Sequence, residues 1–123
     1  MFELIIEDSF SAAHRLKNYK GNCENLHGHN WKVQMVVESE KLDDIGLAID
    51  FRDLKKVLNE VLRILDHKYL NDIEYFQKHN TSSEHIAKFI YTQVKERLKE
   101  FPSVRLKKII CWESEKSAAA YFE

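Results

Sequence analysis

The sequence contains little glycine, proline or cysteine. Of its 123 residues, three are glycine, one is proline and two are cysteine. This scarcity of glycine and proline excludes a collagen-like chain and a linker-rich or low-complexity one. The two cysteines, Cys23 and Cys111, lie far apart and do not make the pattern of a disulfide framework. We therefore expect a protein from a reducing compartment.

Membrane segments and a strong net charge are also missing from the sequence. No apolar run approaches the roughly 18 residues that a membrane helix needs. The opening residues, MFELIIEDSF, carry Glu3 where a signal peptide carries positive charge. With 19 basic and 20 acidic residues, the formal net charge is −1, so no overall basic field points to nucleic acid. These features predict a soluble, cytoplasmic protein that binds neither nucleic acid nor a membrane.

The residues that are present make an ordinary globular mixture. Hydrophobic residues account for 44% and charged residues for 32%, which excludes a disordered chain. A chain of this length fits one domain, residues 1–123, and folding can bury roughly two-thirds of its unfolded surface. The sequence has no internal repeat or change of composition that would mark a domain boundary.

Hydrophobic spacing predicts four strands and two helices. From Trp31 onward, apolar and polar residues alternate as in a half-buried strand, with Val36 the one exception. A helix beginning at Asp50 carries a single-sided apolar stripe of Leu54, Val57, Leu58, Val61, Leu62 and Leu65. A second helix begins near Thr81, where Thr81 and Glu84 are placed as a capping box. The remaining strands are predicted over Phe2 to Arg15, Val104 to Glu113 and Ala118 to Phe122.

This order of elements, ββααββ, predicts an α+β fold. Hairpins at both ends of the chain imply a four-stranded antiparallel sheet, and two amphipathic helices can cover only one of its faces. The other face still carries apolar residues, and the sheet still has edges. We therefore expect copies of the chain to associate with one another.

Three histidines are spaced as metal ligands. In the segment Cys23-Glu24-Asn25-Leu26-His27-Gly28-His29, two histidines stand two residues apart, so on a strand both project from the same face. His14 would come opposite this pair if the first two strands form a hairpin. Three neutral imidazoles at about 2.0–2.1 Å form a zinc site with one open position, which is a catalytic arrangement. Other divalent ions also accept imidazole ligands.

Two neighbouring features have two interpretations each. Cys23 would either close the zinc site as a fourth, structural ligand or remain a free thiol whose pKa the cation lowers. Asp66 and His67 follow the first predicted helix. His67 would either interact with the helix dipole beside a solvated Asp66, or be oriented by Asp66 for proton transfer.

Short motifs spread over most of the chain resemble a known family when they are taken together. They are Phe10 through Arg15, the CxxxHGH segment Cys23 through His29 with Asn30, Ile49 through Phe51, Leu65 through His67 with Leu70 and Asn71, Ser83-Glu84, and Glu113-Ser114. In this order they resemble the 6-pyruvoyltetrahydropterin and 6-carboxytetrahydropterin synthases. The chain reads NTSSE at residues 80–84, where that family often has NPTSE.

The resemblance implies a tunnelling fold (T-fold), whose subunits assemble into a barrel. Such barrels are usually hexamers of two stacked trimers, with active sites at the subunit interfaces. The residues it assigns are the Zn²⁺ ligands His14, His27 and His29, the catalytic thiol Cys23 with its proton-transfer partners Asp66 and His67, the pterin anchor Glu113, and a second pterin contact at Ser83 and Glu84. A helix-capping role is an adequate structural reason for Glu84.

The resemblance also implies the substrate, 7,8-dihydroneopterin triphosphate, and two possible products. Cleavage between the first two side-chain carbons releases acetaldehyde and triphosphate and gives 6-carboxytetrahydropterin, an intermediate toward queuosine and other deazapurines. Loss of triphosphate with an internal redox rearrangement gives 6-pyruvoyltetrahydropterin instead. The short CxxxHGH spacing looks like the bacterial carboxy branch, which we therefore expect. The alternative from another class is a non-enzymatic assembly module in which Cys23 completes a structural zinc site.

Overall fold

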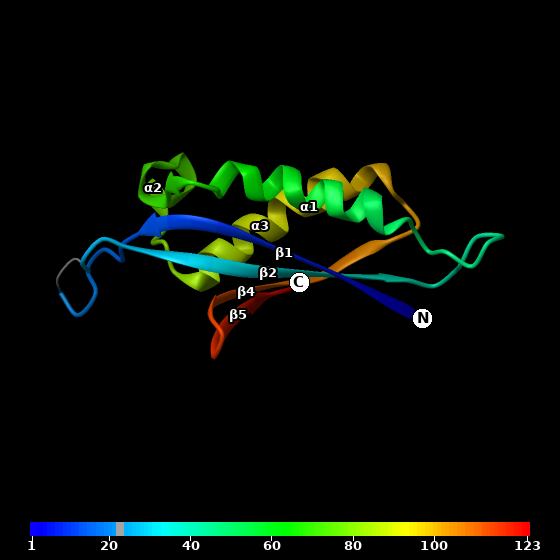
Figure 1. Ribbon diagram of the computed structural model, residues 1–123, viewed down its shortest axis with the longest axis horizontal. Helices are drawn as coiled ribbons and strands as arrows, with labels where there is room; N and C mark the ends of the chain where they lie inside the picture. The colour runs from blue at the N-terminus through cyan, green and yellow to red at the C-terminus, as the bar shows by residue number, and fades with distance from the viewer. Residues whose placement is uncertain (22–23) are drawn as a thin grey trace.

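The computed structural model describes residues 1–21 and 24–123 and consists of a sheet with helices on one side (Figure 1). The strands are β1 (Phe2–His14), β2 (His27–Ser39), β3 (Lys68–Tyr69), β4 (Arg105–Ser114) and β5 (Ser117–Tyr121). The helices are α1 (Phe51–Leu65), α2 (Glu74–Lys78) and α3 (Ser83–Arg97), with 3₁₀ turns at Leu70–Asp72 and Leu98–Glu100.

The sheet is mixed, and its order is β3-β1-β2-β4-β5. The pairs β1–β2, β2–β4 and β4–β5 are antiparallel, whereas β3 runs parallel to β1. The predicted α+β class is confirmed, but the four-stranded antiparallel ββααββ description is not. The additional elements, β3 and α2, have two and five residues. Such short segments hold too few residues for a hydrophobic period to be visible.

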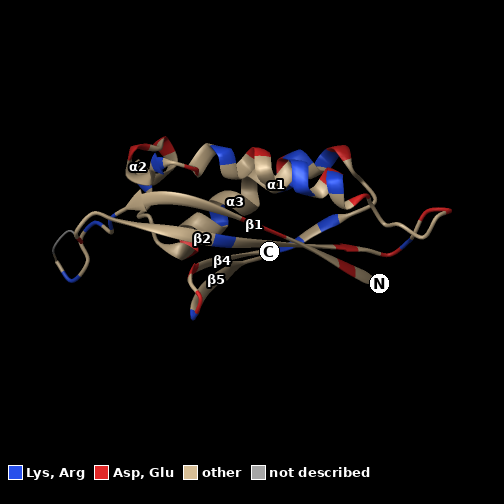
Figure 2. Cartoon of the chain, in the orientation of Figure 1, with Lys and Arg blue, Asp and Glu red and all other residues tan. Residues whose placement is uncertain are grey.

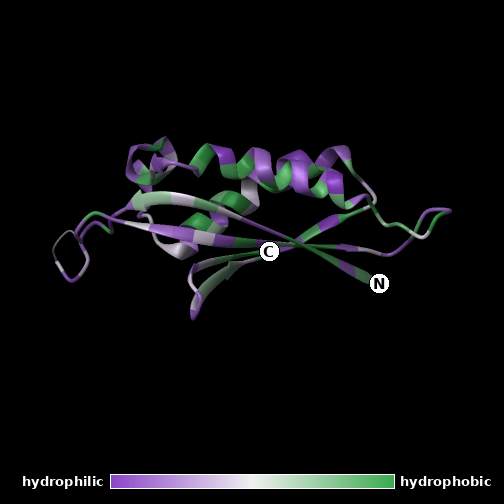
Figure 3. Ribbon diagram, viewed as in Figure 1, coloured by the Kyte–Doolittle hydropathy of each residue, from purple (hydrophilic) through white to green (hydrophobic). Residues whose placement is uncertain are grey.

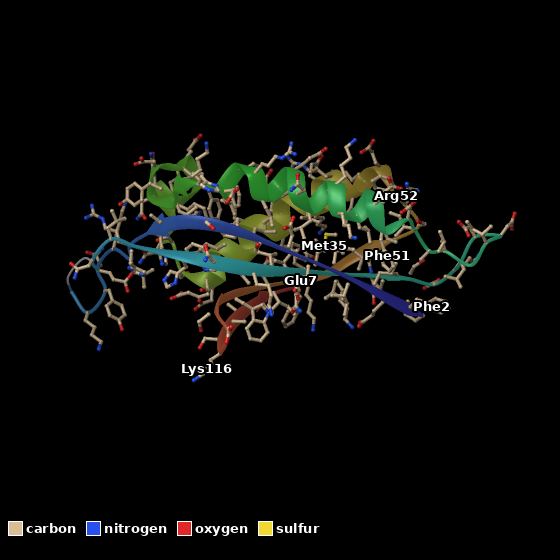
Figure 4. All side chains as sticks on the ribbon, viewed as in Figure 1. Phe2, Glu7, Met35, Phe51, Arg52 and Lys116 are labelled. Carbon is tan, nitrogen blue, oxygen red and sulfur yellow. The ribbon has the colours of Figure 1, made fainter. Side chains whose placement is uncertain are left out.

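The helices cover one face of the sheet and form the core with it. All six residues of the predicted stripe on α1 are buried, and the Asp50 side chain accepts a hydrogen bond from the N–H of Arg52, as expected of an N-cap. Hydrophobic residues recur along both α1 and α3 (Figure 3). Figure 4 shows Met35 of β2 between the sheet and the helices, where it is fully buried, and Arg52 on the outer side of α1.

The start of α3 differs from the prediction. The N-cap is Ser82, whose hydroxyl accepts a hydrogen bond from the N–H of His85. Thr81 is instead fully buried, and its hydroxyl donates to the carbonyl of Arg15 at 3.0 Å. The capping box of Thr81 with Glu84 was therefore wrong. Thr81, Ser82 and Ser83 all carry a hydroxyl group, so the sequence allows each of them as the N-cap. The hydrogen bond of Thr81 to Arg15, just after β1, cannot be seen in the sequence, and it takes Thr81 out of this role.

The face of the sheet away from the helices retains some apolar surface, as predicted. Ile5 of β1 is 58% exposed there. Val36, the exception to the alternation in β2, is buried next to an irregularity in the pairing with β4 between Val36 and Val37. Acidic and basic residues are interspersed over the chain (Figure 2). Within residues 1–21 and 24–123, no helix is both long and apolar enough to cross a membrane.

Candidate metal centre and proton-transfer pair

The hairpin of β1 and β2 brings the three predicted histidines together. His14 pairs directly with His27, and Ala12 pairs with His29, so the expected register is confirmed. All three side chains lie on the face that carries the helices, at the end of the sheet. The ring centre of His27 lies 4.7 Å from those of both His14 and His29, and the centres of His14 and His29 are 5.3 Å apart.

Main-chain carbonyls orient two of the three rings. Nδ1 of His14 lies 2.8 Å from the carbonyl oxygen of Thr81, and Nδ1 of His27 lies 2.7 Å from that of Asn25. A carbonyl oxygen can only accept a hydrogen bond, so Nδ1 carries the proton in both rings. In the neutral form of these rings Nε2 then has a free lone pair, as in a metal-ligating histidine.

The electrostatic environment favours neutral imidazole at His14. Only 2% of this residue is exposed, and burial is the main cause that lowers its pKa below the usual value of a histidine. The Thr81 carbonyl acts in the opposite direction, while the neighbouring His27 lowers the pKa further. A neutral ring is the form that binds a metal ion.

The ligand atoms fit a cation. Nε2 of His14 and Nε2 of His29 are both buried, and neither has a hydrogen-bond partner among the residues that the structure describes. An unpartnered buried polar atom is costly, and a metal ion would satisfy both atoms at once. The ligand atoms of His14, His27, His29 and Glu113 all lie within 4.8 Å of one another. Imidazole nitrogens and one carboxylate are a donor set that zinc accepts.

Glu113 reaches this cluster from β4. The pairing of β4 with β5 shifts register between Trp112 and Ser114, and Glu113 lies at that irregularity. Its Oε1 lies 3.3 Å from Nε2 of His29, and its Oε2 accepts a hydrogen bond from the Ser83 hydroxyl at 3.1 Å. Sequence reasoning assigned Glu113 to the pterin but did not place it beside the metal ligands.

Three side chains hold the chain just after β1 in place, and sequence reasoning missed their role. The Asn71 amide bonds both the N–H and the carbonyl of Arg15, at 3.1 and 2.9 Å. The Asn80 amide does the same for Lys17, at 2.8 and 2.9 Å. Together with the Thr81 hydroxyl, these amides satisfy main-chain groups that no strand pairs, and they fix the position of His14.

Asp66 and His67 form a second, separate unit at the other edge of β1. The Asp66 carboxylate accepts from the N–H of Ser11 at 2.9 Å, and the N–H of His67 donates to the Ser11 carbonyl at 2.6 Å. These two bonds hold His67 at a φ of 56°, a left-handed conformation that is uncommon for a residue other than glycine. Nδ1 of His67 lies 2.9 Å from Oδ2 of Asp66.

This geometry supports proton transfer at His67. The carboxylate fixes the proton on Nδ1 and leaves Nε2 free to accept one. The Ser11 N–H, followed by His67, lowers the pKa of Asp66 below its usual range, so the carboxylate stays ionised. The His67 side chain is 82% exposed. Neither residue belongs to the metal-ligand cluster.

An open hollow of about 510 Å³ lies beside both units. Its lining includes His29 and Gly28 of β2 and His67. A Cβ at Gly28 would meet the Ala12 carbonyl at 3.7 Å, an ordinary contact, so packing within the chain does not require glycine there. A larger hollow of about 780 Å³ lies between the end of α3 and β4, and none of the clustered ligands lines it.

The predicted thiol, the predicted second pterin contact and the second cysteine complete the set of residues singled out in the sequence. Cys23, the predicted thiol, lies outside the described residues. Ser83 contacts Glu113, whereas Glu84 is exposed in the first turn of α3. Cys111 is fully buried, and burial raises the pKa of its thiol to about 12, so it packs in the core as a small apolar residue does.

Comparisons with known proteins agree with the motifs. The sequence model of the family described as 6-pyruvoyl tetrahydropterin synthase matches residues 3–123. The 6-carboxy-5,6,7,8-tetrahydropterin synthase of Haemophilus influenzae is 32% identical over the full length of both chains. The dihydroneopterin monophosphate aldolase of Pyrococcus furiosus is 37% identical over 89% of this chain and 88% of its own. The solved Caenorhabditis elegans 6-pyruvoyl tetrahydropterin synthase is 28% identical and superimposes with a TM-score of 0.86, covering 99% of this chain and 95% of that one.

Proposed function

The chain belongs to the 6-pyruvoyl tetrahydropterin synthase family, and from this premise we propose that it is a zinc-dependent 6-carboxytetrahydropterin synthase. It would convert 7,8-dihydroneopterin triphosphate and one water into 6-carboxytetrahydropterin, acetaldehyde and triphosphate, in the route to queuosine. The single observation that carries this proposal is the convergence of three imidazoles. Two of them, His14 and His27, have their free Nε2 fixed by main-chain carbonyls.

His14, His27 and His29 would hold the zinc ion. Bound there, zinc would supply Lewis-acid chemistry, lowering the pKa of the hydroxyl groups on the substrate side chain. The chain's contribution is to orient the rings of His14 and His27 and to favour the neutral form of His14 before the metal arrives. The buried, carbonyl-anchored His14 supports this role.

Cys23, Asp66 and His67 would move protons. As a thiolate, Cys23 would take the proton from the first side-chain carbon of the substrate. Nε2 of His67 would take or return a proton at the neighbouring hydroxyl, while Asp66 keeps the opposite ring nitrogen protonated. The 2.9 Å contact between Asp66 and His67 supports their part of this proposal. The role of Cys23 rests on the family resemblance.

Glu113 would recognise the pterin. A carboxylate can accept two parallel, charge-assisted hydrogen bonds from the guanidine-like edge of a pterin. The hydrogen bond from Ser83 to Glu113 supports a role for Ser83 in the same recognition site. Glu84 would provide a further contact from the exposed first turn of α3.

The working enzyme would be an oligomeric T-fold barrel, most simply a hexamer of two trimers. The exposed side chain of His67 supports a site that a neighbouring subunit completes, because this residue lies outside the group of candidate metal ligands of its own chain. The apolar surface that the helices leave uncovered also favours association. Sedimentation velocity would measure the mass of the assembly, and a monomer at working concentration would contradict this part.

A product assay tests the reaction. The purified, metal-loaded protein is incubated separately with the triphosphate and the monophosphate of 7,8-dihydroneopterin, and acetaldehyde and the pterin products are quantified. We expect one acetaldehyde per 6-carboxytetrahydropterin from the triphosphate. A 6-pyruvoyl product without acetaldehyde would place the chain in the other branch. Turnover of the monophosphate alone would place it with the aldolase that it resembles at 37% identity.

A further inference from the structure

The hollow of about 510 Å³ beside His67 offers positive charge and hydrogen-bond donors. Lys68 and Tyr69, the two residues of β3, line it together with His67. None of the described residues that line it is an aspartate or a glutamate. Asp66, which precedes His67, already accepts a hydrogen bond from the Ser11 N–H and contacts Nδ1 of His67. The hollow therefore suits an anion.

Asn30 of β2 adds an amide group to this hollow. It pairs directly with Ser11 of β1, and the Ser11 hydroxyl donates to its Oδ1 at 2.5 Å. Because the amide oxygen accepts this proton, the NH₂ group of Asn30 is left to donate to a ligand. Lys68 lies on the other side of β1, where it pairs with Ala12. Asn30 and Lys68 thus reach the hollow from the two strands that flank β1.

The proposed reaction brings a phosphate group close to these donors. The side chain of 7,8-dihydroneopterin triphosphate has three carbons, and the triphosphate is esterified to the third. His67 would exchange a proton at the hydroxyl of the second carbon, so the first phosphate follows one carbon further along. A lysine ammonium and an amide N–H both donate hydrogen bonds to phosphate oxygens. The hollow beside His67 is therefore within reach of the first phosphate.

We propose that Lys68 and Asn30 bind the first phosphate of the substrate and thereby select phosphorylated pterins. This inference rests on the proposed function and assigns its phosphate-binding residues. Lys68 supplies a charge-assisted hydrogen bond, and Asn30 supplies a neutral one. The monophosphate and the triphosphate share this first phosphate. The assignment therefore holds for whichever of the two the chain converts.

The bound phosphate belongs to a substrate at the metal site of a neighbouring subunit. Ala12 and His29 project from the face of the sheet that carries the helices, and consecutive residues on a strand project from opposite faces. The side chains of Ser11 and Asn30 therefore lie on the face without helices. A substrate held by the chain's own histidines lies across the sheet from them. Lys68 and Asn30 thus serve the adjoining copy.

Lys32 provides a matched control for Lys68. It lies on β2 two residues after Asn30, so both side chains project from the same face of the sheet. Its ammonium group lies 5.0 Å from the ring centre of Trp112, and Lys32 does not line the hollow. It therefore carries the same charge on the same face without being placed to bind the phosphate.

The test compares neopterin with neopterin monophosphate, two oxidised analogues that differ only in the phosphate, by calorimetry on the metal-loaded protein. We expect the phosphate to raise the affinity for the unaltered protein, and Lys68→Met to reduce this gain by about tenfold or more. Neopterin itself should bind both proteins equally. Lys32→Met should keep the full gain. Asn30→Asp, which places a negative charge in a side chain of nearly the same shape, should abolish it.

Three results would overturn the proposal. One is a neopterin monophosphate that binds the unaltered protein no more tightly than neopterin does. Another is a Lys68→Met protein that keeps the full gain from the phosphate. The third is an equal loss of affinity for both ligands, which would show that the substitution disturbs pterin binding. Circular dichroism and sedimentation check folding and assembly, and Lys68→Gln replaces a Met variant that fails either check.

Mixed oligomers test the placement in the neighbouring subunit. At low substrate concentration, oligomers refolded from equal amounts of Lys68→Met and His27→Ala should regain about one quarter of full activity, because each site then draws its two halves from different chains. A mixture of Lys68→Met with Asp66→Asn should contain no unaltered site, since both residues belong to the same half. An absence of recovery in the first mixture would place Lys68 at the metal site of its own chain.

The outcome is separable from that of the proposed reaction. The binding test depends on the phosphate contact and needs no turnover, whereas the product assay depends on the chemistry that follows. A phosphate-dependent gain that Lys68→Met removes, without acetaldehyde release, would uphold the phosphate site and reject the carboxy reaction. Acetaldehyde release with an unchanged gain in Lys68→Met would do the reverse.

Discussion

His14 and His67 are held in similar ways in opposite surroundings. In both rings Nδ1 donates to an oxygen and Nε2 is free, but the acceptor is the Thr81 carbonyl for His14 and the Asp66 carboxylate for His67. His14 is 2% exposed, whereas the side chain of His67 is 82% exposed. His14 meets the other metal-ligand candidates of its own chain, and His67 presents its free nitrogen to solvent.

The difference in exposure suits His14 to metal binding and His67 to proton transfer. Burial holds His14 neutral and stationary, which suits a permanent ligand. A ring that picks up and releases protons must reach its reaction partner, and the exposed Nε2 of His67 can do so. The histidine cluster can form within one chain, whereas the exposed pair is open to contact with another molecule.

The largest expected effect comes from breaking the histidine cluster. His27→Ala removes one of three neutral ligands at a position that tolerates truncation, since a third of its side chain is exposed. We expect bound zinc to fall from about one ion per chain to almost none, and turnover to fall about 10³-fold or more. Elemental analysis measures the bound zinc, and the product assay measures the turnover. His79→Ala, at an exposed histidine outside the cluster, should change neither.

Mixing two inactive variants tests whether the histidine cluster and the Asp66–His67 pair of one site come from different subunits. Asp66→Asn should retain zinc and lose about 10²–10⁴-fold in turnover, because His67 loses the acceptor that fixes its tautomer. If a neighbouring subunit supplies the proton-transfer pair, oligomers refolded from equal amounts of His27→Ala and Asp66→Asn should regain about one quarter of full activity. Oligomers that contain both variants, as judged by tagged subunits, and stay inactive would indicate that the histidine cluster and the proton-transfer pair of each site come from one chain.

A smaller effect is expected from loosening the support of His14. Thr81→Val keeps the shape of the side chain but leaves the Arg15 carbonyl without one of its donors. We expect a loss of about 1–3 kcal/mol in the free energy of unfolding, measured with urea. Thr92→Val, at an exposed helical threonine whose hydroxyl bonds the Lys88 carbonyl, should change stability by less than about 0.5 kcal/mol. Equal losses in the two variants would contradict this account.

The smallest expected effect is a pH dependence at the exposed pair. The pKa of Asp66 is lower in the folded chain than in the unfolded one, so its ionised form stabilises the fold above the unfolded value of about 3.9. This contribution is lost as the pH falls through the folded pKa. The stability difference between the unaltered protein and Asp66→Asn should therefore be constant near neutral pH and shrink below about pH 4. If the stability difference between the two proteins instead grows as the pH falls, the pKa of Asp66 is raised by folding and not lowered.

Local patterns predicted the histidine cluster because it depends on strand geometry. The two-residue spacing of His27 and His29 fixes their common face, and a hairpin register brings His14 opposite. The stripe of α1 was predictable for the same reason, since its period is visible in the sequence.

The support of the cluster could not be predicted in this way. Asn71, Asn80 and Thr81 contact the end of β1 across more than fifty residues of sequence, and nothing in their local pattern indicates a partner. The left-handed turn at His67 is likewise imposed by a distant residue, Ser11. Glu113 was assigned from the family resemblance, but its distance from His29 depends on the irregular pairing of β4.

The carbonyl anchors of His14 and His27 have a consequence for how freely this site can vary. The accepting oxygens belong to the peptide backbone at Thr81 and Asn25, so the acceptor itself does not depend on which side chain stands at either position. The side chain of Asn25 can therefore change without removing the acceptor that orients the His27 ring, whereas Thr81 also has a side-chain contact with Arg15 to keep. A peptide oxygen also carries no formal charge. A cation bound by rings that donate to peptide oxygens therefore remains a stronger Lewis acid than one bound by rings that donate to carboxylates.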